Sequence, residues 1–161
     1  MSKPIGIVAV FLLAFSLAAV AEADEIFKAR LTGDQEVPPV VTDTTGRAEI
    51  QMNRSETEGE FTLRVNDGIR VTQAHLHCAP IGVNGPVVVF LAGLHEAGLN
   101  VDGKWISNAS FTDTSIVNLA CGATVSALAA SMRAGNVYVN VHTVAHPAGE
   151  VRGQVEPAFD D

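Results

Sequence analysis

Short stretches rich in β-branched residues recur along the chain, separated by Gly, Asn, Asp and Pro. This pattern is typical of an all-β domain with many turns. Within residues 60–65, Phe61, Leu63 and Val65 share one face, because successive side chains of a strand point to opposite sides. The expected strands cover residues 26–31, 46–52, 60–65, 71–77, 86–91, 105–111, 136–144 and 150–155.

The strand over 136–144 has the strictest alternation. It places three valines toward the core and sets three other side chains on the opposite face, namely Tyr138, Asn140 and His142. Before it, residues 126–133 carry Ala, Leu and Met at helical spacing, and Gly135 follows where a helix end favours positive φ. One short helix is therefore expected.

Turn chemistry completes the fold prediction. Residues 66–68 read Asn-Asp-Gly, which predicts a hairpin between the strands over 60–65 and 71–77. About seven strands and one helix, with no internal repeat, indicate a sandwich or a Greek-key barrel.

The N-terminus has the composition of an export signal. Lys3 precedes an apolar run over 5–20, and small residues follow it at 19–23. This order is that of a secretory signal peptide, and A-x-A sites end at Ala21 and Ala23. An uncleaved anchor is the alternative, but the run is shorter than the roughly 18–20 residues that a span needs. We therefore expect a signal peptide over 1–23, a single domain over 24–161, and a secreted or periplasmic protein without a stable membrane anchor.

Composition adds two expectations about the 161-residue chain. A hydrophobic fraction of 47% is that of a folding chain rather than a disordered one. Ten Lys and Arg stand against 18 Asp and Glu, for a net charge of −8, and the ten are scattered along the sequence. Because phosphate binding needs a clustered basic face, we expect no nucleic acid partner and regard polyanions as poor partners.

Two cysteines, Cys78 and Cys121, remain after export. Even numbers of cysteines in exported domains usually pair, so we expect a disulfide that stabilises the fold by roughly 4 kcal/mol. Thiolate metal ligands or a reactive thiol are the alternatives. No C-x-x-C motif supports a redox enzyme.

Five histidines carry the clearest indication of chemistry. His75 and His77 are two apart on an expected strand, so they point to the same side with Cα atoms roughly 6.5–7 Å apart. His142 lies on the polar face of another strand, and His95 or His146 would supply a further ligand. Imidazoles suit copper or zinc. The alternative is that these histidines only brace strands through hydrogen bonds to carbonyls.

Five sequence blocks in order resemble the CHRD domain, the module named after chordin, over about residues 27–155. They are LTGDQEVPP (31–39), TGRA (45–48), AHLHCAPIGVNGP (74–86), GNVYVNVHT (135–143) and GEVRGQV (149–155). The resemblance implies an immunoglobulin-like or superoxide-dismutase-like β-sandwich. In chordin such domains belong to an extracellular antagonist of growth factors, and single-domain bacterial members are exported. Chordin's activity does not transfer, because its cysteine-rich modules are absent here.

Within these blocks, the extended segment over 36–39 is expected to end the first strand. Glu36 is expected to pair with Arg152, because a buried carboxylate needs a partner, and both would be structural. The loop with Gly82, Gly85 and Pro86 is expected to turn the chain after His77.

The His75-Leu-His77 layout with a late His142 also resembles the copper ligands of copper/zinc superoxide dismutase. That enzyme uses more histidines and an aspartate across two metals, so the resemblance implies at most a mononuclear copper or zinc site here. Three hypotheses result: a metal-binding exported protein, a metal-free interaction module, and a dismutase-like metalloenzyme. No G-x-S-x-G, H-E-x-x-H or phosphate-binding motif is present, so enzymatic activity is not the leading expectation.

Overall fold

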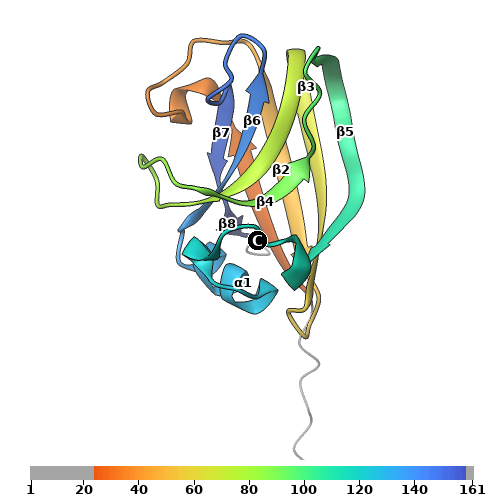
Figure 1. The fold of residues 1–161 in the computed structure, drawn as a ribbon, viewed down its shortest axis with the longest axis vertical. Coiled ribbons are helices and arrows are strands. Elements are labelled where there is room, and N and C mark those ends of the chain that lie inside the picture. Colours follow the sequence, from red (N-terminus) through yellow and green to blue (C-terminus); the bar gives the residue numbers. More distant parts are fainter. Residues whose placement is uncertain (1–23, 159–161) are drawn as a thin grey trace, which may run out of the picture.

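The alternation of apolar and polar residues builds eight strands and one α-helix within residues 24–158, which the computed structural model describes (Figure 1). The strands are β1 (Glu25–Leu31), β2 (Thr45–Met52), β3 (Glu58–Cys78), β4 (Val87–Ala92), β5 (Leu99–Thr112), β6 (Val137–Thr143), β7 (Val151–Gln154) and β8 (Glu156–Pro157). The helix is α1 (Val125–Arg133), and short 3-10 turns cover Gly33–Gln35, Asp113–Ser115 and Leu119–Cys121. The predicted all-β class with one short helix is confirmed.

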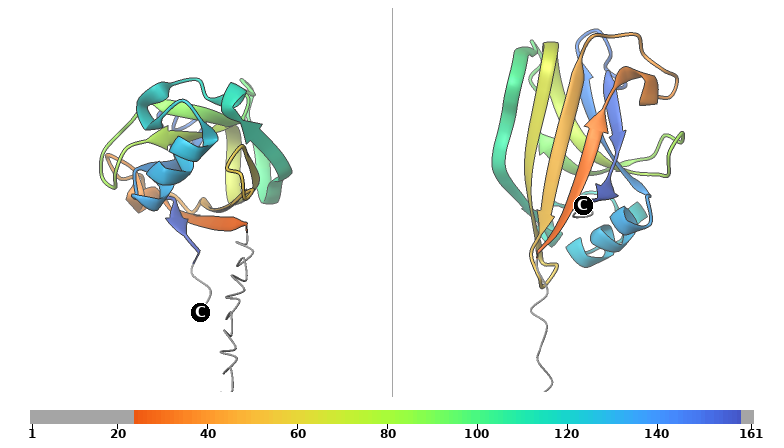
Figure 2. Two further views of the ribbon diagram at one scale, coloured as in Figure 1. Left: turned by 90° about the horizontal axis from the view of Figure 1, so that it is seen from below. Right: turned by 180° about the vertical axis from the view of Figure 1, so that it is seen from behind.

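The long strand β3 belongs to both halves of one sheet. Its first half pairs with β2 and β5, and its second half pairs with β4 and β6. The main path of the sheet runs β7-β6-β3-β2-β1-β8. The two halves face each other, and the sheet is nearly closed into a barrel (Figure 2).

Backbone bonds between Thr32, which directly follows β1, and Arg152 of β7 bring these two strands together. Each residue donates its N–H to the carbonyl of the other, at 3.0 and 3.1 Å. Gly153 permits this approach, since a Cβ there would lie 2.3 Å from the Arg30 carbonyl oxygen. A side chain at position 153 would force β7 away from β1, so glycine is a steric requirement of the closure.

The predicted hairpin at 66–68 is wrong, because β3 continues through these residues. Asp67 and Arg70 adopt φ values of 53° and 52°, and the register with β5 shifts on both sides of Gly68. The turn residues therefore bend the strand and carry it from one half of the sheet to the other, instead of reversing it. The expected end of the first strand at 36–39 is also misplaced: β1 ends at Leu31, before the turn over Gly33–Gln35.

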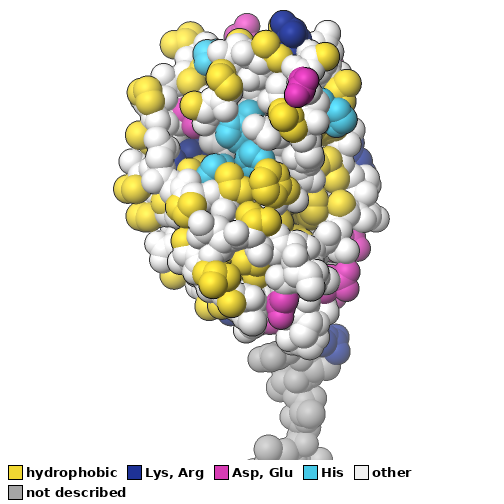
Figure 3. Space-filling view, viewed as in Figure 1, with side chains coloured by type: hydrophobic (Ala, Val, Ile, Leu, Met, Phe, Trp, Pro, Cys, Tyr) yellow, Lys and Arg dark blue, Asp and Glu magenta, His cyan; other side chains and the backbone are white. Residues whose placement is uncertain are grey.

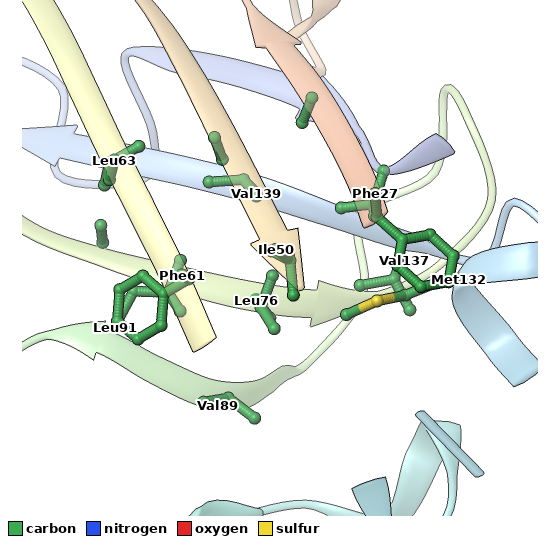
Figure 4. Close-up of a cluster of buried hydrophobic side chains, with 14 of the residues drawn as sticks. Phe27, Ile50, Phe61, Leu63, Leu76, Val89, Leu91, Met132, Val137 and Val139 are labelled. Atoms are coloured by element: carbon green, nitrogen blue, oxygen red, sulfur yellow. The ribbon is translucent and has the colours of Figure 1, made fainter. Parts of the chain in front are cut away.

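The apolar core lies between the two halves of the sheet. Phe27, Ile50 and Leu63 come from one half, and Leu76 and Val139 come from the other (Figure 4). Their alternation with exposed residues is the predicted one, most regularly in β2, where every second residue is buried. Burial of these side chains is the main favourable contribution to folding.

Helix α1 covers one end of this core (Figures 1 and 2). The Thr124 hydroxyl caps it by accepting from the Ala127 N–H at 3.2 Å, and Gly135 follows the helix with φ 70°, as predicted. Leu128 and Met132 are buried on its inner side. Among residues 24–158, no helix combines the length and the apolar character that crossing a bilayer would require. The predicted signal peptide lies outside the described residues.

A disulfide joins Cys78, the last residue of β3, to Cys121 in the turn before α1. The two Cα atoms are 5.6 Å apart and 43 positions separate the residues in the sequence. The expected pairing is therefore present in the structure. It ties the end of the histidine-bearing strand to the segment that leads into the helix.

Replacing both cysteines, Cys78→Ser with Cys121→Ser, is expected to lower the free energy of unfolding by about 4 kcal/mol, because the unfolded chain loses its cross-link. Urea unfolding of the oxidised protein and of the double variant measures this difference. Reduction of the unmodified protein should reproduce it. Equal midpoints for oxidised and reduced protein would contradict a stabilising bridge.

Candidate metal centre

The site is built on β6, whose seven residues are all buried. Its valines face the core as predicted, so Tyr138, Asn140 and His142 occupy the other side of the strand. Loop segments around residues 36–44, 79–86 and 144–150 contribute hydrogen-bond partners to side chains on this polar side. A polar layer is thereby enclosed outside the apolar core.

Three histidines converge in this layer. His75 and His77 project from β3 and His142 projects from the neighbouring β6, and all three are buried. One ring nitrogen of each lies within 4.8 Å of those of the other two. The closest pair is His75 Nδ1 and His142 Nε2, at 3.0 Å. The structure thus brings together the three residues that the sequence predicted on two adjacent strands.

Backbone carbonyls fix the tautomers of two of these rings. His77 Nδ1 donates to the Gly85 carbonyl at 2.9 Å, and His142 Nδ1 donates to the Pro147 carbonyl at 3.1 Å. Because a carbonyl only accepts, each Nδ1 carries the proton and each Nε2 presents a lone pair. Metal-ligating histidines are oriented in this way by a bond from the second ring nitrogen.

Two of the ring nitrogens in this group form no hydrogen bond. His75 Nε2 and His77 Nε2 are buried and have no hydrogen-bond partner. His75 Nδ1 donates to the His142 Nε2 lone pair, since His142 has its proton on Nδ1. Buried acceptors without donors are costly, on the order of 1–3 kcal/mol each.

Burial keeps the three imidazoles neutral. Desolvation lowers the pKa of His75 to about 3, and the neighbouring His142 and His77 add to the effect. Desolvation also lowers the pKa of His142 to about 4 and depresses the pKa of His77. Neutral imidazole is the form that ligates metals, so no proton has to leave these rings at neutral pH.

An aromatic stack supports His77. The Tyr138 ring packs on the His77 ring, with centroids 4.7 Å apart and planes 12° apart. The Arg152 guanidinium lies 3.4 Å from the Tyr138 centroid, and β6 lies between β3 and β7, so Tyr138 separates the two. Arg152 is only 1% exposed, and it donates to the carbonyls of Pro80 and Val83. The arginine therefore holds the loop that contains Gly85, which in turn orients His77.

The expected ion pair between Glu36 and Arg152 is not formed. Asn140 Nδ2 instead donates to the two carboxylate oxygens of Glu36, at 3.1 and 3.2 Å. The Glu36 side chain is buried and only 6% exposed. Burial raises the pKa of Glu36 to about 7, against the lowering effects of Asn140 and of the Arg152 charge. Both residues are buried, and Arg152 bonds the 80–84 loop in place of the carboxylate.

A second buried carboxylate, Glu150, lies directly before β7, and sequence reasoning missed it. Three threonine hydroxyls donate to it, from Thr42, from Thr44 at 2.9 Å and from Thr143. Burial alone would raise the pKa of Glu150, but these bonds together hold it below its ordinary value. Glu150 belongs to the block over 149–155, but Thr42 and Thr44 lie more than 100 positions away and give no sequence signal for this contact.

The other two histidines do not join the group. His95 lies exposed in the segment between β4 and β5, where its N–H donates to the Thr72 carbonyl. The His146 N–H donates to Thr143 Oγ1, and its side chain is half-buried. The loop after His77, expected only to turn the chain, has a further role because its Gly85 carbonyl binds a histidine ring.

Hydrophobic side chains surround the histidine cluster at the surface. The Phe90 ring meets the edge of His75, with centroids 4.8 Å apart, and remains 53% exposed. Ile81, Val83 and Val144, from the covering loops, are also exposed. Figure 3 shows histidine side chains near the middle of this face with hydrophobic side chains beside them. The cluster thus lies just below the surface rather than deep in the core.

Three neutral imidazoles are a donor set for copper or zinc. Tetrahedral ligands at about 2.0–2.1 Å from a metal lie roughly 3.3–3.4 Å apart. His75 Nδ1 and His142 Nε2, 3.0 Å apart, are already close to that separation. The other candidate nitrogens lie within 4.8 Å of one another, so they would have to approach by at most about 1.5 Å to reach it. His75 can change tautomer and offer Nδ1, since its Nε2 has no partner to lose.

Comparison with known proteins identifies one family. The family model described as CHRD domain matches residues 27–155, which is most of the chain. Neither the curated proteins nor the solved structures contain a significant match.

Replacing Glu36 by glutamine is expected to stabilise the protein above pH 7, because an amide needs no desolvation of charge and can donate to the unpartnered Asn140 Oδ1. The native carboxyl has a raised pKa, so its stabilising contribution is complete below about pH 4.5 and is lost as pH rises through about 7. Between about pH 4.5 and 7, the free energy of unfolding of Glu36→Gln should therefore rise by about 2–3 kcal/mol relative to that of the unmodified protein. Denaturant unfolding at pH 4 to 8 measures it.

The variant Glu150→Gln provides a control of opposite sign. Its native carboxyl has a lowered pKa, so the stabilising effect of the charge is present above about pH 4.5 and lost as pH falls. Glu150→Gln should be less stable than the unmodified protein at pH 7, with the difference shrinking in acid. The same pH trend in both variants would contradict the opposite pKa shifts of Glu36 and Glu150.

Proposed function

Because the chain belongs to the CHRD-domain family, we propose that it is an exported protein that binds one copper or zinc ion through His75, His77 and His142. The observation that carries this proposal is the convergence of buried imidazole nitrogens that lack a partner. His75 Nε2 and His77 Nε2 are both orphaned, and both lie in the group whose third member is His142.

The alternative, that these histidines only brace strands, fits the geometry less well. Bracing accounts for His77 Nδ1 on Gly85 and for His142 Nδ1 on Pro147. It leaves the buried lone pair of His77 Nε2 without a donor, at a cost that a bound cation would remove. A bound metal also converts the short contact between His75 and His142 into shared coordination.

Copper is expected to bind more tightly than zinc. At a site of nitrogen donors, affinity follows the Irving–Williams order, in which Cu²⁺ exceeds Zn²⁺. The three donors are uncharged, so the metal keeps its full charge inside the layer. The neighbouring rings, Tyr138 and Phe90, are uncharged, whereas the Arg152 guanidinium against Tyr138 adds a positive charge that also depresses the pKa of His77.

The arrangement supports binding more than turnover. One group of three metal-type ligands is found within residues 24–158, so a two-metal dismutase site has no second ligand set there. The free nitrogens are buried, which limits access of a substrate to a bound ion. Superoxide turnover by the copper-loaded protein would show that the metal is catalytic and would overturn this part of the proposal.

Export is supported by the N-terminal sequence and by the disulfide. The basic start, apolar run and small residues within 1–23 have the order of a secretory signal. Disulfides persist in oxidising compartments such as the periplasm and the extracellular space, and Cys78–Cys121 is such a bond. N-terminal sequencing of protein recovered from the culture medium or the periplasm tests this, with a start at Glu22 or Asp24 expected.

Metal content of the protein produced from the full chain tests the site. We expect about one copper or zinc per chain by elemental analysis after incubation and desalting. His77→Gln and His142→Gln should each weaken binding by about 100-fold or more in titration calorimetry, because two ligands hold the ion far less well than three.

The remaining histidines supply matched controls. His95→Gln and His146→Gln remove an imidazole outside the group and should leave stoichiometry and affinity unchanged. Electron paramagnetic resonance of the copper-loaded unmodified protein needs no variant and should show hyperfine coupling to imidazole nitrogens. Substoichiometric metal, or equal losses in the control variants, would refute the site.

A further inference from the structure

A row of four cations crosses the face of the sheet opposite the histidine site. Arg30 of β1 lies directly opposite Arg47 of β2, Arg47 lies opposite Arg64 of β3, and Arg64 lies opposite Lys104 of β5. All four side chains are exposed. These four strands lie side by side in the view from behind (Figure 2, right).

The cations are scattered along the sequence, as stated above, but the fold gathers four of them on one surface. The four residues are spread over 75 positions of the chain, and only the strand register gathers them. Together with Lys28 they line a groove of about 660 Å³ on this face. An acidic chain with a net charge of −8 thus concentrates five of its ten Lys and Arg in one groove.

Folding does not account for this row. Like charges directly opposite each other in a sheet are destabilising. Within residues 24–158 the ion pairs with carboxylates involve Arg54 and Arg133, and none involves the four members of the row. Lys28 differs, because Glu49 and Glu156 lie opposite it on its two sides. The row is therefore a local concentration of positive charge without ion pairs in residues 24–158, and Glu49 is the one acidic residue in the groove lining.

We propose that the row formed by Arg30, Arg47, Arg64 and Lys104 binds an extended anionic polysaccharide that carries sulfate or carboxylate groups. Neighbouring strands are about 4.8 Å apart, so the four cations span roughly 14 Å in a nearly straight line. A polysaccharide with an anionic group on successive rings presents charges in a comparable linear series. Guanidinium groups bind sulfate and carboxylate through paired hydrogen bonds.

The lining of the groove distinguishes this ligand from other polyanions. It contains no aromatic side chain on which unstacked bases could lie, which single-stranded nucleic acid binding uses. It also lacks a large apolar side chain that could enter a lipid layer.

Binding to defined polymers tests the proposal, using protein from the full chain in buffer with a metal chelator so that the histidine site does not contribute. Dextran sulfate and alginate separate sulfate from carboxylate recognition, and neutral dextran is the blank. We expect saturable binding to at least one anionic polymer. Arg47→Gln with Arg64→Gln should weaken it about 30-fold, and rising salt should weaken it further.

The control removes two positive charges outside the groove: Arg54→Gln with Arg70→Gln should retain affinity within about threefold. The row variant should also melt at the same or a higher temperature than the unmodified protein, because repulsion between opposite strands is relieved. Equal losses in both double variants, no binding to either anionic polymer, or tighter binding to oligo(dT) or to phosphatidylglycerol vesicles would overturn the proposal.

Discussion

Burial of β6 on both of its faces is the constraint on which the arrangement of the site depends. Its valines join the apolar core, so its alternate residues, Tyr138, Asn140 and His142, are withdrawn from water on the other side. Buried polar groups must find partners within the protein. Those partners come from the loops: Glu36 accepts from Asn140, and the Pro147 carbonyl accepts from His142. The covering loops are therefore held by hydrogen bonds to the sheet rather than by apolar packing alone.

The position of the histidine cluster depends on β3, the strand that both halves of the sheet share. The bend near Asp67 and Arg70 lets the first half of β3 serve one layer and the second half serve the other. His75 and His77 lie in the second half, beside β6, and Cys78 ends the strand at the disulfide. A true hairpin at 66–68 would have reversed the chain there and removed the histidine pair from the neighbourhood of His142.

Local periodicity in the sequence predicts many of the strands and the direction of their side chains. Features that depend on pairing between distant residues could not be predicted in this way. Alternation predicted the strand over 136–144 and the common face of His75 and His77, because side-chain direction in a strand depends only on adjacent residues. The same Asn-Asp-Gly chemistry serves a turn or a bend, and only the pairing with β5 decides between them. Likewise, Glu36 could not be assigned to Asn140 rather than to Arg152, since 104 positions separate the bonded residues.

Two features of the domain oppose its own stability, and they lie on the outer surfaces of the two opposed halves of the sheet. The orphaned nitrogens of His75 and His77 cost desolvation without a bond in return, and the aligned cations of Arg47 and Arg64 repel each other. Sequences that fold well satisfy local and global requirements together, so departures from that consistency are concentrated at functional sites. The proposed metal ion would remove the cost at His77 Nε2, and the proposed polyanion would relieve the repulsion between the arginines. Because the two costs call for ligands of opposite charge and the two proposed sites share no residue, the proposed metal ion and anionic polymer would not compete for the same side chains.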